Sequence, residues 1–254
     1  MDLFTIAVST FTAFLAGIVA SISGGGSLVM LPMLLVLGVA PHATLGTMKM
    51  VTTIGAASAS LAYAAKKKIN WTLAVPGMFI IAPAAFAGSG LTLWISPDLL
   101  GKIMLGLLPV GMLLALVSPS KKQVTQQANT LTRLQAWVVG PLIILFCGMY
   151  DGFFGPGAGT FLIIGMTSLL RMDLITACGT GRFLTTVSCL VSVLVFGVSG
   201  QIVYELAVPM LIATVAGNLL GSRIALRGDT RLVRYFIFGT VTLLFFNLLY
   251  MYVF

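Results

Sequence analysis

The stretch Gly155-Pro156-Gly157-Ala158-Gly159-Thr160 interrupts a run of apolar residues that extends from 133 to 171. A second glycine break, Ser23-Gly24-Gly25-Gly26-Ser27, interrupts the first apolar run of the chain in the same way. Glycine and proline both disfavour a continuous helix. The pieces that follow the breaks, 28–40 and 161–171, are too short to cross about 30 Å of hydrocarbon as straight helices. They are predicted to be half-helices or re-entrant segments.

Composition places these runs in a membrane. Of the 254 residues, 59% are hydrophobic and 8% are charged, and the mean hydropathy is +1.09. A soluble protein of this size cannot bury so much apolar surface, so lipid is the predicted surrounding. The fold class is all-α integral membrane with about eight to ten membrane segments, including broken helices at the glycine-rich loops. Apolar spans are expected near 44–65, 71–94, 99–117, 133–154, 174–198, 203–226 and 231–253.

The two glycine breaks belong to a longer internal repeat. Sliding the chain by 133 residues pairs 24–106 with 157–239, and 19 of the 83 aligned pairs are identical, against about 7 expected from this composition. The sequence therefore predicts a duplication. Its parts are a first membrane repeat over 1–118, a cytoplasmic linker over 119–132 and a second membrane repeat over 133–254.

The charges of equivalent loops indicate how the two repeats are oriented. The loop Lys66-Lys67-Lys68 is basic, whereas its repeat mate Ser199-Gly200-Gln201 is uncharged. Conversely, Ser96-Pro97-Asp98 carries no base, whereas the matching end of the second repeat contains several arginines. Basic loops remain in the cytoplasm. The repeats are therefore expected to be inverted, as in many secondary transporters, with both termini outside.

The glycine loops are the first candidate binding elements. Unwound backbone at membrane depth needs protein or water to satisfy its N–H and C=O groups, so the two loops are expected to face each other near the midplane. Helix ends there would present free N–H groups to an anion. The alternative is that the glycines only allow close helix packing. The candidate binding residues in these loops are Gly24, Gly25, Gly26, Ser27, Gly157, Gly159 and Thr160.

Two cations lie inside apolar segments at repeat-equivalent positions. They are Lys49, which follows Thr47, and Arg182, which follows Thr180. A charge within a membrane helix is costly and is by default functional or paired. With the two threonines, the cations are predicted to bind a small oxyanion, Arg182 as a fork and Lys49 as a point charge. Snorkelling of both side chains to the lipid headgroups is the alternative.

Asp151 and His42 are the candidate coupling residues. Asp151 lies just before the second glycine break and is expected to take a coupling proton or to form an ion pair, with Arg182 as a possible partner. His42 follows Pro41 in an expected loop. We interpret it as a solvated side chain, with a role in a proton relay as the alternative.

Other functional classes lack a signature. The sequence has no His-Glu-x-x-His motif, no Walker lysine after the glycine runs and no plausible serine-histidine-acid set. Neither an enzyme nor a metal or other cofactor is therefore expected. The formal net charge of +8 is assigned to contacts with lipid headgroups or an anionic solute, and not to nucleic acid.

Several of these stretches resemble a known protein family. The stretch 148–160, together with Gly24-Gly25-Gly26-Ser27, Pro41-His42 and Gly46-Thr47-Met48-Lys49, resembles the TauE/SafE family of sulfite and organosulfonate exporters. The resemblance covers nearly the whole chain. It implies a bacterial inner-membrane permease that moves sulfur-containing anions outward.

The chain departs from the family pattern at two functional positions. Similar family members often carry an acid where Ala20 stands and a lysine where Arg182 stands. The first departure leaves Asp151 without a carboxylate counterpart in the first repeat. The second offers a bidentate donor to an oxyanion.

The predicted function is secondary transport, by alternating access, of small sulfur-containing anions such as sulfite or organosulfonates. The resemblance implies export. Membrane potential alone could drive it, because an anion that leaves a cell negative inside gains about 2.3 kcal/mol per charge per 100 mV. A coupling proton or other ion is a second possible driving force. The alternatives are an anion channel and a transporter of another small anion, such as a carboxylate or sulfate.

Overall fold

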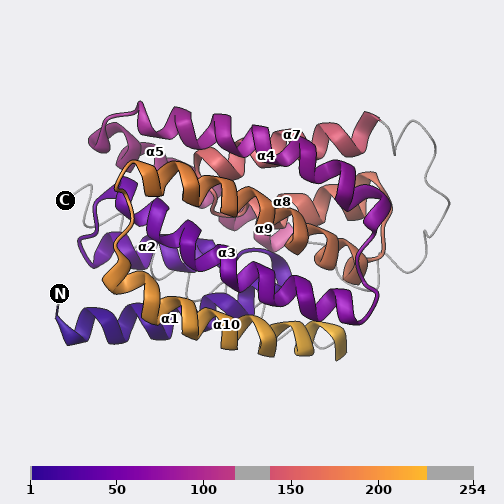
Figure 1. Ribbon diagram of the computed structural model, residues 1–254, viewed down its shortest axis with the longest axis horizontal. Helices are drawn as coiled ribbons and strands as arrows, with labels where there is room; N and C mark the ends of the chain where they lie inside the picture. Colours follow the sequence, from indigo (N-terminus) through magenta and orange to yellow (C-terminus); the bar gives the residue numbers. More distant parts are fainter. Residues whose placement is uncertain (1, 118–137, 228–254) are drawn as a thin grey trace.

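The computed structural model describes residues 2–117 and 138–227, and within these ranges the secondary structure is entirely helical. Most helices run side by side along the long axis of the molecule (Figure 1). The elements are α1 (Leu3–Ser23), α2 (Ser27–Val36), α3 (Pro41–Ala65), α4 (Trp71–Leu93), α5 (Pro97–Val117), α7 (Gly140–Phe153), α8 (Ala158–Ile164), the π-helical turn η2 (Gly165–Leu169), α9 (Leu174–Val198) and α10 (Tyr204–Arg227).

The apolar runs predicted these helices closely. The span expected at 174–198 coincides with α9, and the one at 71–94 differs from α4 by a single residue. Both interrupted runs are confirmed as pairs of helices separated at glycine, α1 with α2 and α7 with α8. The span expected near 231–253 and the linker over 119–132 lie outside the described residues.

Polar residues explain where several of these helices begin. The side chain of Asn70 accepts the N–H of Leu73 at 3.3 Å and caps α4. Asp173 caps α9 in the same way, accepting from the N–H groups of Ile175 and Thr176. Pro41 occupies the first turn of α3, where its missing N–H costs nothing.

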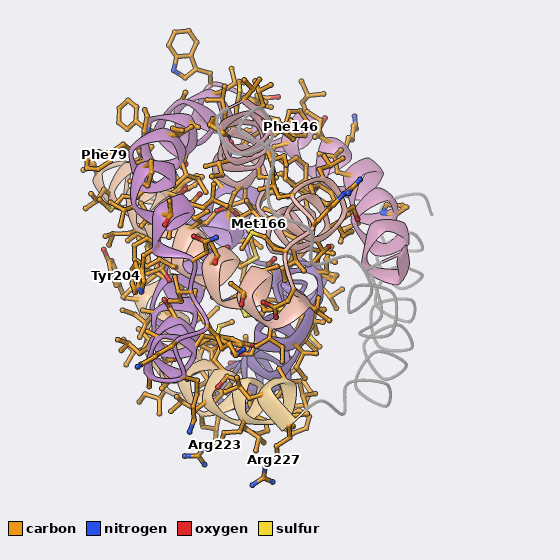
Figure 2. All side chains as sticks on the ribbon, turned by 90° about the vertical axis from the view of Figure 1, so that its right-hand side faces the viewer. Phe79, Phe146, Met166, Tyr204, Arg223 and Arg227 are labelled. Carbon is orange, nitrogen blue, oxygen red and sulfur yellow. The ribbon has the colours of Figure 1, made fainter. Side chains whose placement is uncertain are left out.

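The outer surface of the bundle is apolar. Phe79 and Phe146 are 70% and 69% exposed and project outward from the bundle (Figure 2). Within the described residues, α1, α4, α9 and α10 are each long and apolar enough to cross a membrane. Arg223 and Arg227 project from the last turns of α10, where positive charge also suits the helix dipole (Figure 2).

The two long helices α3 and α9 pack against each other in opposite directions. The start of α3 meets the end of α9, because the N–H of Val203 donates to Thr47 Oγ1 at 2.9 Å. The end of α3 meets the start of α9, because the N–H of Asn70 donates to Thr180 Oγ1 at 3.0 Å. The loops 66–70 and 199–203 therefore lie at opposite ends of this pair. Helix α10 covers α3 on one side, and α4 covers α9 on the other.

The interrupted helices form two hairpins whose tips meet. One hairpin consists of α1 and α2, the other of α7 and α8, and Thr160 Oγ1 donates to the carbonyl of Ser23 at 2.9 Å between them. Gly24 has φ +78° and lies so close to the opposite tip that a Cβ here would be 2.6 Å from the nitrogen of Thr160. Glycine is therefore required at Gly24 both for its backbone conformation and for the close approach.

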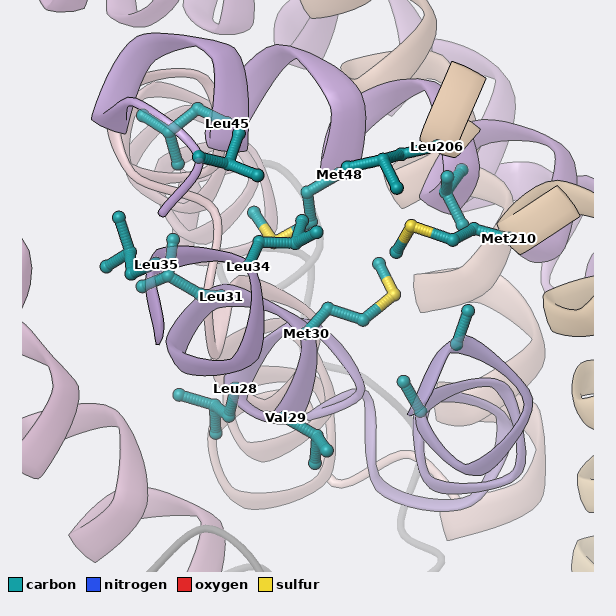
Figure 3. Close-up of a cluster of buried hydrophobic side chains, with 14 of the residues drawn as sticks. Leu28, Val29, Met30, Leu31, Leu34, Leu35, Leu45, Met48, Leu206 and Met210 are labelled. Carbon is teal, nitrogen blue, oxygen red and sulfur yellow. The ribbon is translucent and has the colours of Figure 1, made fainter. Parts of the chain in front are cut away.

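A hydrophobic cluster anchors the half-length helix α2. Leu31 and Leu34 of α2 are fully buried and pack with Leu45 and Met48 of α3. Figure 3 shows Met30 of α2 extending toward Met210 of α10 within the same cluster. The cluster fixes α2 beside α3 and α10, so packing on these two helices positions the hairpin tip.

Candidate functional site

A small cavity lies where the two hairpin tips approach α3, α9 and α10. It is lined by backbone of both glycine loops and by polar side chains of the long helices. The space available to the centres of water molecules is about 20 Å³, enough for one or two waters. The predicted site residues that line it are Gly24, Gly26, Ser27, Lys49, Asp151, Gly159 and Arg182.

Lys49 and Arg182 lie well inside their helices. Each is eight residues beyond the first residue of its helix, Pro41 of α3 or Leu174 of α9, which corresponds to about 12 Å of helix. Because α3 and α9 are antiparallel, the two cations approach the cavity from opposite ends. Both side chains are 2% exposed, so neither reaches out to the surface as a snorkelling side chain would.

Lys49 is neutralised by an acid from the second hairpin. Its Nζ lies 2.8 Å from Asp151 Oδ1, and it also donates to the backbone carbonyl of Asp151. Asp151 is 4% exposed and lies in the last turn of α7, next to the glycine break. The ion pair thus joins a long helix of one half to the hairpin tip of the other.

The second carboxylate oxygen of Asp151 is also satisfied. Asp151 Oδ2 accepts a hydrogen bond from Ser188 Oγ, and Cys189 Sγ lies 3.6 Å away. Both residues belong to α9. The carboxylate therefore binds α3 through Lys49 and α9 through Ser188, and it pairs with Lys49 rather than with Arg182.

Arg182 has no acidic partner among residues 2–117 and 138–227. Its Nη1 lies 3.4 Å from the carbonyl of Ala20, at the tip of the first hairpin. Within the described ranges, Nε and Nη2 have no hydrogen-bond partner, although both atoms are buried. A buried guanidinium whose donors are unmatched is costly, and Arg182 lines the cavity.

Thr185 contributes a further unmatched donor. It was not predicted as a site residue from the sequence. Its Oγ1 is buried without a partner among the described residues, and the side chain lines the cavity. Thr185 is three residues beyond Arg182, so both lie on one face of α9. The available signal was its place as the repeat mate of Thr52, which also lines the cavity.

The remaining threonine candidates use their hydroxyls elsewhere. Thr47 and Thr180 accept the backbone N–H groups of Val203 and Asn70 and do not line the cavity. Thr160 donates to Ser23 and joins the hairpin tips. These three hydroxyls hold loops and tips together at the edges of the site.

Three other candidates do not line the cavity. Gly25 and Gly157 belong to the glycine loops, and Gly157 adopts φ +86°. His42 is not the solvated loop residue expected from the sequence. It lies buried in the first turn of α3, with Nε2 3.1 Å from the carbonyl of Thr92, because Pro41 starts the helix earlier than expected.

Among the described residues, the charged groups that line the cavity are two cations and one carboxylate, which together carry one net positive charge. Within the described residues, no cluster of histidine, cysteine and acidic side chains could hold a metal ion. The arrangement suits the binding of a small anion, because the free donors belong to an arginine and a threonine in a dry environment.

Comparison with known proteins identifies the family. The family described as Sulfite exporter TauE/SafE matches residues 9–248. The chain belongs to this family. It is also similar to "Probable membrane transporter protein ORF9" of a Sinorhizobium species, with 30% identity over 222 residues that cover 87% of this chain and 84% of the relative. No solved structure matches the chain.

Further relatives carry the same kind of name. "Probable membrane transporter protein YfcA" of Escherichia coli K12 is 28% identical over 229 residues, 90% of this chain and 84% of the relative. A "Probable membrane transporter protein" of Haemophilus influenzae is 29% identical over 234 residues, 90% and 88% of the two chains. Together with the four membrane-spanning candidates, these relatives identify a multi-pass membrane protein and indicate a transporter of the TauE/SafE type.

Proposed function

We propose that this protein is a secondary transporter of small sulfur-containing anions, such as sulfite or organosulfonates. The observation that carries the proposal is the buried Arg182, which lines the cavity and whose Nε and Nη2 have no partner in the described structure. An anion would supply the missing acceptors and compensate the net charge of the site. Membership of the TauE/SafE family supports a sulfur-containing anion as the substrate.

The anion would bind at Arg182, in the cavity that Lys49 and its partner Asp151 also line, with backbone of the two glycine loops close to it. Gly24, Gly26 and Gly159 allow the loops to approach the cavity without side chains in the way. Ser27 lines the same cavity from the start of α2. The present volume holds one or two waters, so binding would require the tips to separate from the long helices.

We propose further that the two halves, 1–118 and 133–254, are inverted repeats joined by a cytoplasmic linker. Contacts at equivalent positions support this: the bond between Val203 and Thr47 has its counterpart 133 residues away in the bond between Asn70 and Thr180. Inverted repeats that meet at a central site are the usual basis of alternating access. The halves would rock about α3 and α9 and expose the cavity to each side in turn.

The proposed direction is export across the inner membrane of a bacterium. Membrane potential favours the exit of an anion by about 2.3 kcal/mol per charge per 100 mV. Asp151 is the candidate for an additional coupling proton, because it links α3, α7 and α9 through one carboxylate. Protonation would release Lys49 and Ser188 together.

Flux measurements in liposomes test this function. Purified protein is reconstituted with radiolabelled sulfite or methanesulfonate inside, and efflux is followed with and without an imposed potential. The proposal expects saturable efflux that speeds up when the trans side is positive and is lost in Arg182→Ala. Lys102→Ala, which removes an exposed cation on α5, is the control and keeps wild-type efflux.

The outcomes separate the carrier from its alternatives. A carrier shows counterflow, in which unlabelled anion on one side drives labelled anion from the other. Flux that does not saturate and shows no counterflow would identify a channel. Flux of sulfate or carboxylates with none of the sulfur anions named above would identify a transporter of a different anion.

A further inference from the structure

The charges around the cavity carry an inference about the substrate, which rests on the function proposed above. We propose that the bound anion carries a single negative charge and lies edge-on against Nε and Nη2 of Arg182, with Thr185 Oγ1 as a third donor. Organosulfonates, hydrogen sulfite and carboxylates meet this requirement. Dianions such as sulfate do not.

Lys49 is already paired with an acid. Its ammonium is matched by Asp151 at 2.8 Å, and the pair is buried. Its charge is therefore already compensated before any anion binds. Of the charged groups in the described ranges that line the cavity, only Arg182 is left to compensate the charge of a substrate.

The free donors of Arg182 suit a group with two oxygens. Nη1 of Arg182 lies 3.4 Å from the carbonyl of Ala20, whereas Nε and Nη2 have no partner in the part of the chain that is described. These two nitrogens form one edge of the guanidinium, and their parallel N–H groups match two oxygens of a carboxylate or sulfonate. Thr185, one turn further along α9, lines the same cavity, and its Oγ1 has no partner among the described residues.

A second negative charge on the bound anion would be costly. A dianion would bring one negative charge more than the site compensates, into a cavity that holds one or two waters. Uncompensated charge in a dry environment is strongly disfavoured. We therefore expect monoanions to bind at least about tenfold more tightly than dianions of the same shape, which corresponds to about 1.4 kcal/mol.

Methanesulfonate and sulfate are the matched probes, because both are small and tetrahedral and they differ by one charge. Their dissociation constants are measured by calorimetry on wild-type protein in detergent. The account predicts that methanesulfonate binds at least tenfold more tightly. Equal affinity, or tighter binding of sulfate, overturns it, while the transport of anions through this site still stands. If neither these probes nor any other small anion binds, the proposed function itself fails.

Variants that change the net charge of the site provide the second test. Lys49→Met lowers it to zero and is expected to abolish binding of methanesulfonate, whereas the double variant Lys49→Met/Asp151→Asn restores one positive charge and restores binding. Asp151→Asn alone raises the charge to two and shifts preference toward sulfate. A folded double variant that fails to bind shows Lys49 to be a direct ligand and contradicts the proposal.

A pair of adjacent threonines tests the third donor without changing any charge. Thr185→Val removes the unmatched hydroxyl and should weaken methanesulfonate binding about five- to tenfold. Thr186→Val is the control, since Thr186 Oγ1 donates to the carbonyl of Arg182 within the helix. Equal affinities of the two variants would remove Thr185 from the site.

Discussion

Lys49 and Arg182 occupy equivalent positions in the two halves but have different surroundings. Lys49 reaches a hairpin tip that offers the carboxylate of Asp151, whereas Arg182 reaches the other tip and, within the described part of the chain, donates only to the carbonyl of Ala20. One cation therefore stabilises the closed arrangement, and the other is left with free donors. A difference of one side chain at the tips makes a nearly symmetric site chemically asymmetric.

The Lys49–Asp151 pair predicts a specific pattern of stability. Removal of either partner leaves a buried charge without compensation, so Lys49→Met and Asp151→Asn should each destabilise the protein by about 3–5 kcal/mol. The double variant should recover most of this loss. Thermal unfolding in detergent measures the effect. Additive losses in the double variant would contradict the pairing.

The sequence identified these charged residues but not their pairing. Lys49, Arg182 and Asp151 are conspicuous because charges are rare in apolar segments. Which cation the acid neutralises depends on how the tip of one half packs against the long helix of the other, and no local pattern contains that information. Thr185 was not predicted for a similar reason. A threonine in a helix is distinguished from other threonines only when the structure shows that its hydroxyl has no partner.

The helices and their interruptions were largely predictable. Runs of apolar residues mark the spans, and Asn70 and Asp173 mark two of the helix starts. The exception is the start of α3, where Pro41 and His42 belong to the helix and not to a loop. A proline predicts the first turn of a helix as well as a loop, so the sequence did not distinguish the two.

Gly24 and Gly38 allow a controlled test of the hairpin tip. Both have φ near +80°, so alanine at either position costs about 1–2 kcal/mol in backbone strain. A Cβ at Gly24 would also collide with the opposite tip, whereas nothing lies within 4 Å of one at Gly38. Gly24→Ala should therefore lower the melting temperature more than Gly38→Ala and abolish transport. Equal losses would mean that the tips do not touch.

The loop ties at Thr47 and Thr180 should behave alike. Each hydroxyl satisfies a backbone N–H at the end of the opposite long helix, so valine leaves that N–H unmatched at a cost of about 1–3 kcal/mol. Thr47→Val and Thr180→Val are expected to lower thermal stability by similar amounts. Thr12→Val, which removes only a bond to the carbonyl of Val8 within α1, is the control and should change little.

The proposed inverted repeats predict opposite accessibility of equivalent loops across the membrane. Lys66 and Ser199 are exposed, lie 133 residues apart and follow α3 and α9, which run in opposite directions. In intact cells, Ser199→Cys should react with a membrane-impermeant maleimide, and Lys66→Cys should react only after permeabilisation. The native cysteines are buried and supply the unlabelled background. Reaction of both variants in intact cells would contradict inverted repeats.

In the proposed mechanism, Arg182 holds the transported anion between the two hairpin tips. A crystal structure with bromomethanesulfonate tests it most directly, because anomalous scattering from bromine locates the ligand. We expect its sulfonate oxygens within hydrogen-bond distance of Nε and Nη2 of Arg182 and of Thr185 Oγ1, with the Lys49–Asp151 pair intact. A ligand bound at Lys49 with Asp151 displaced, or outside the cavity, would contradict the account.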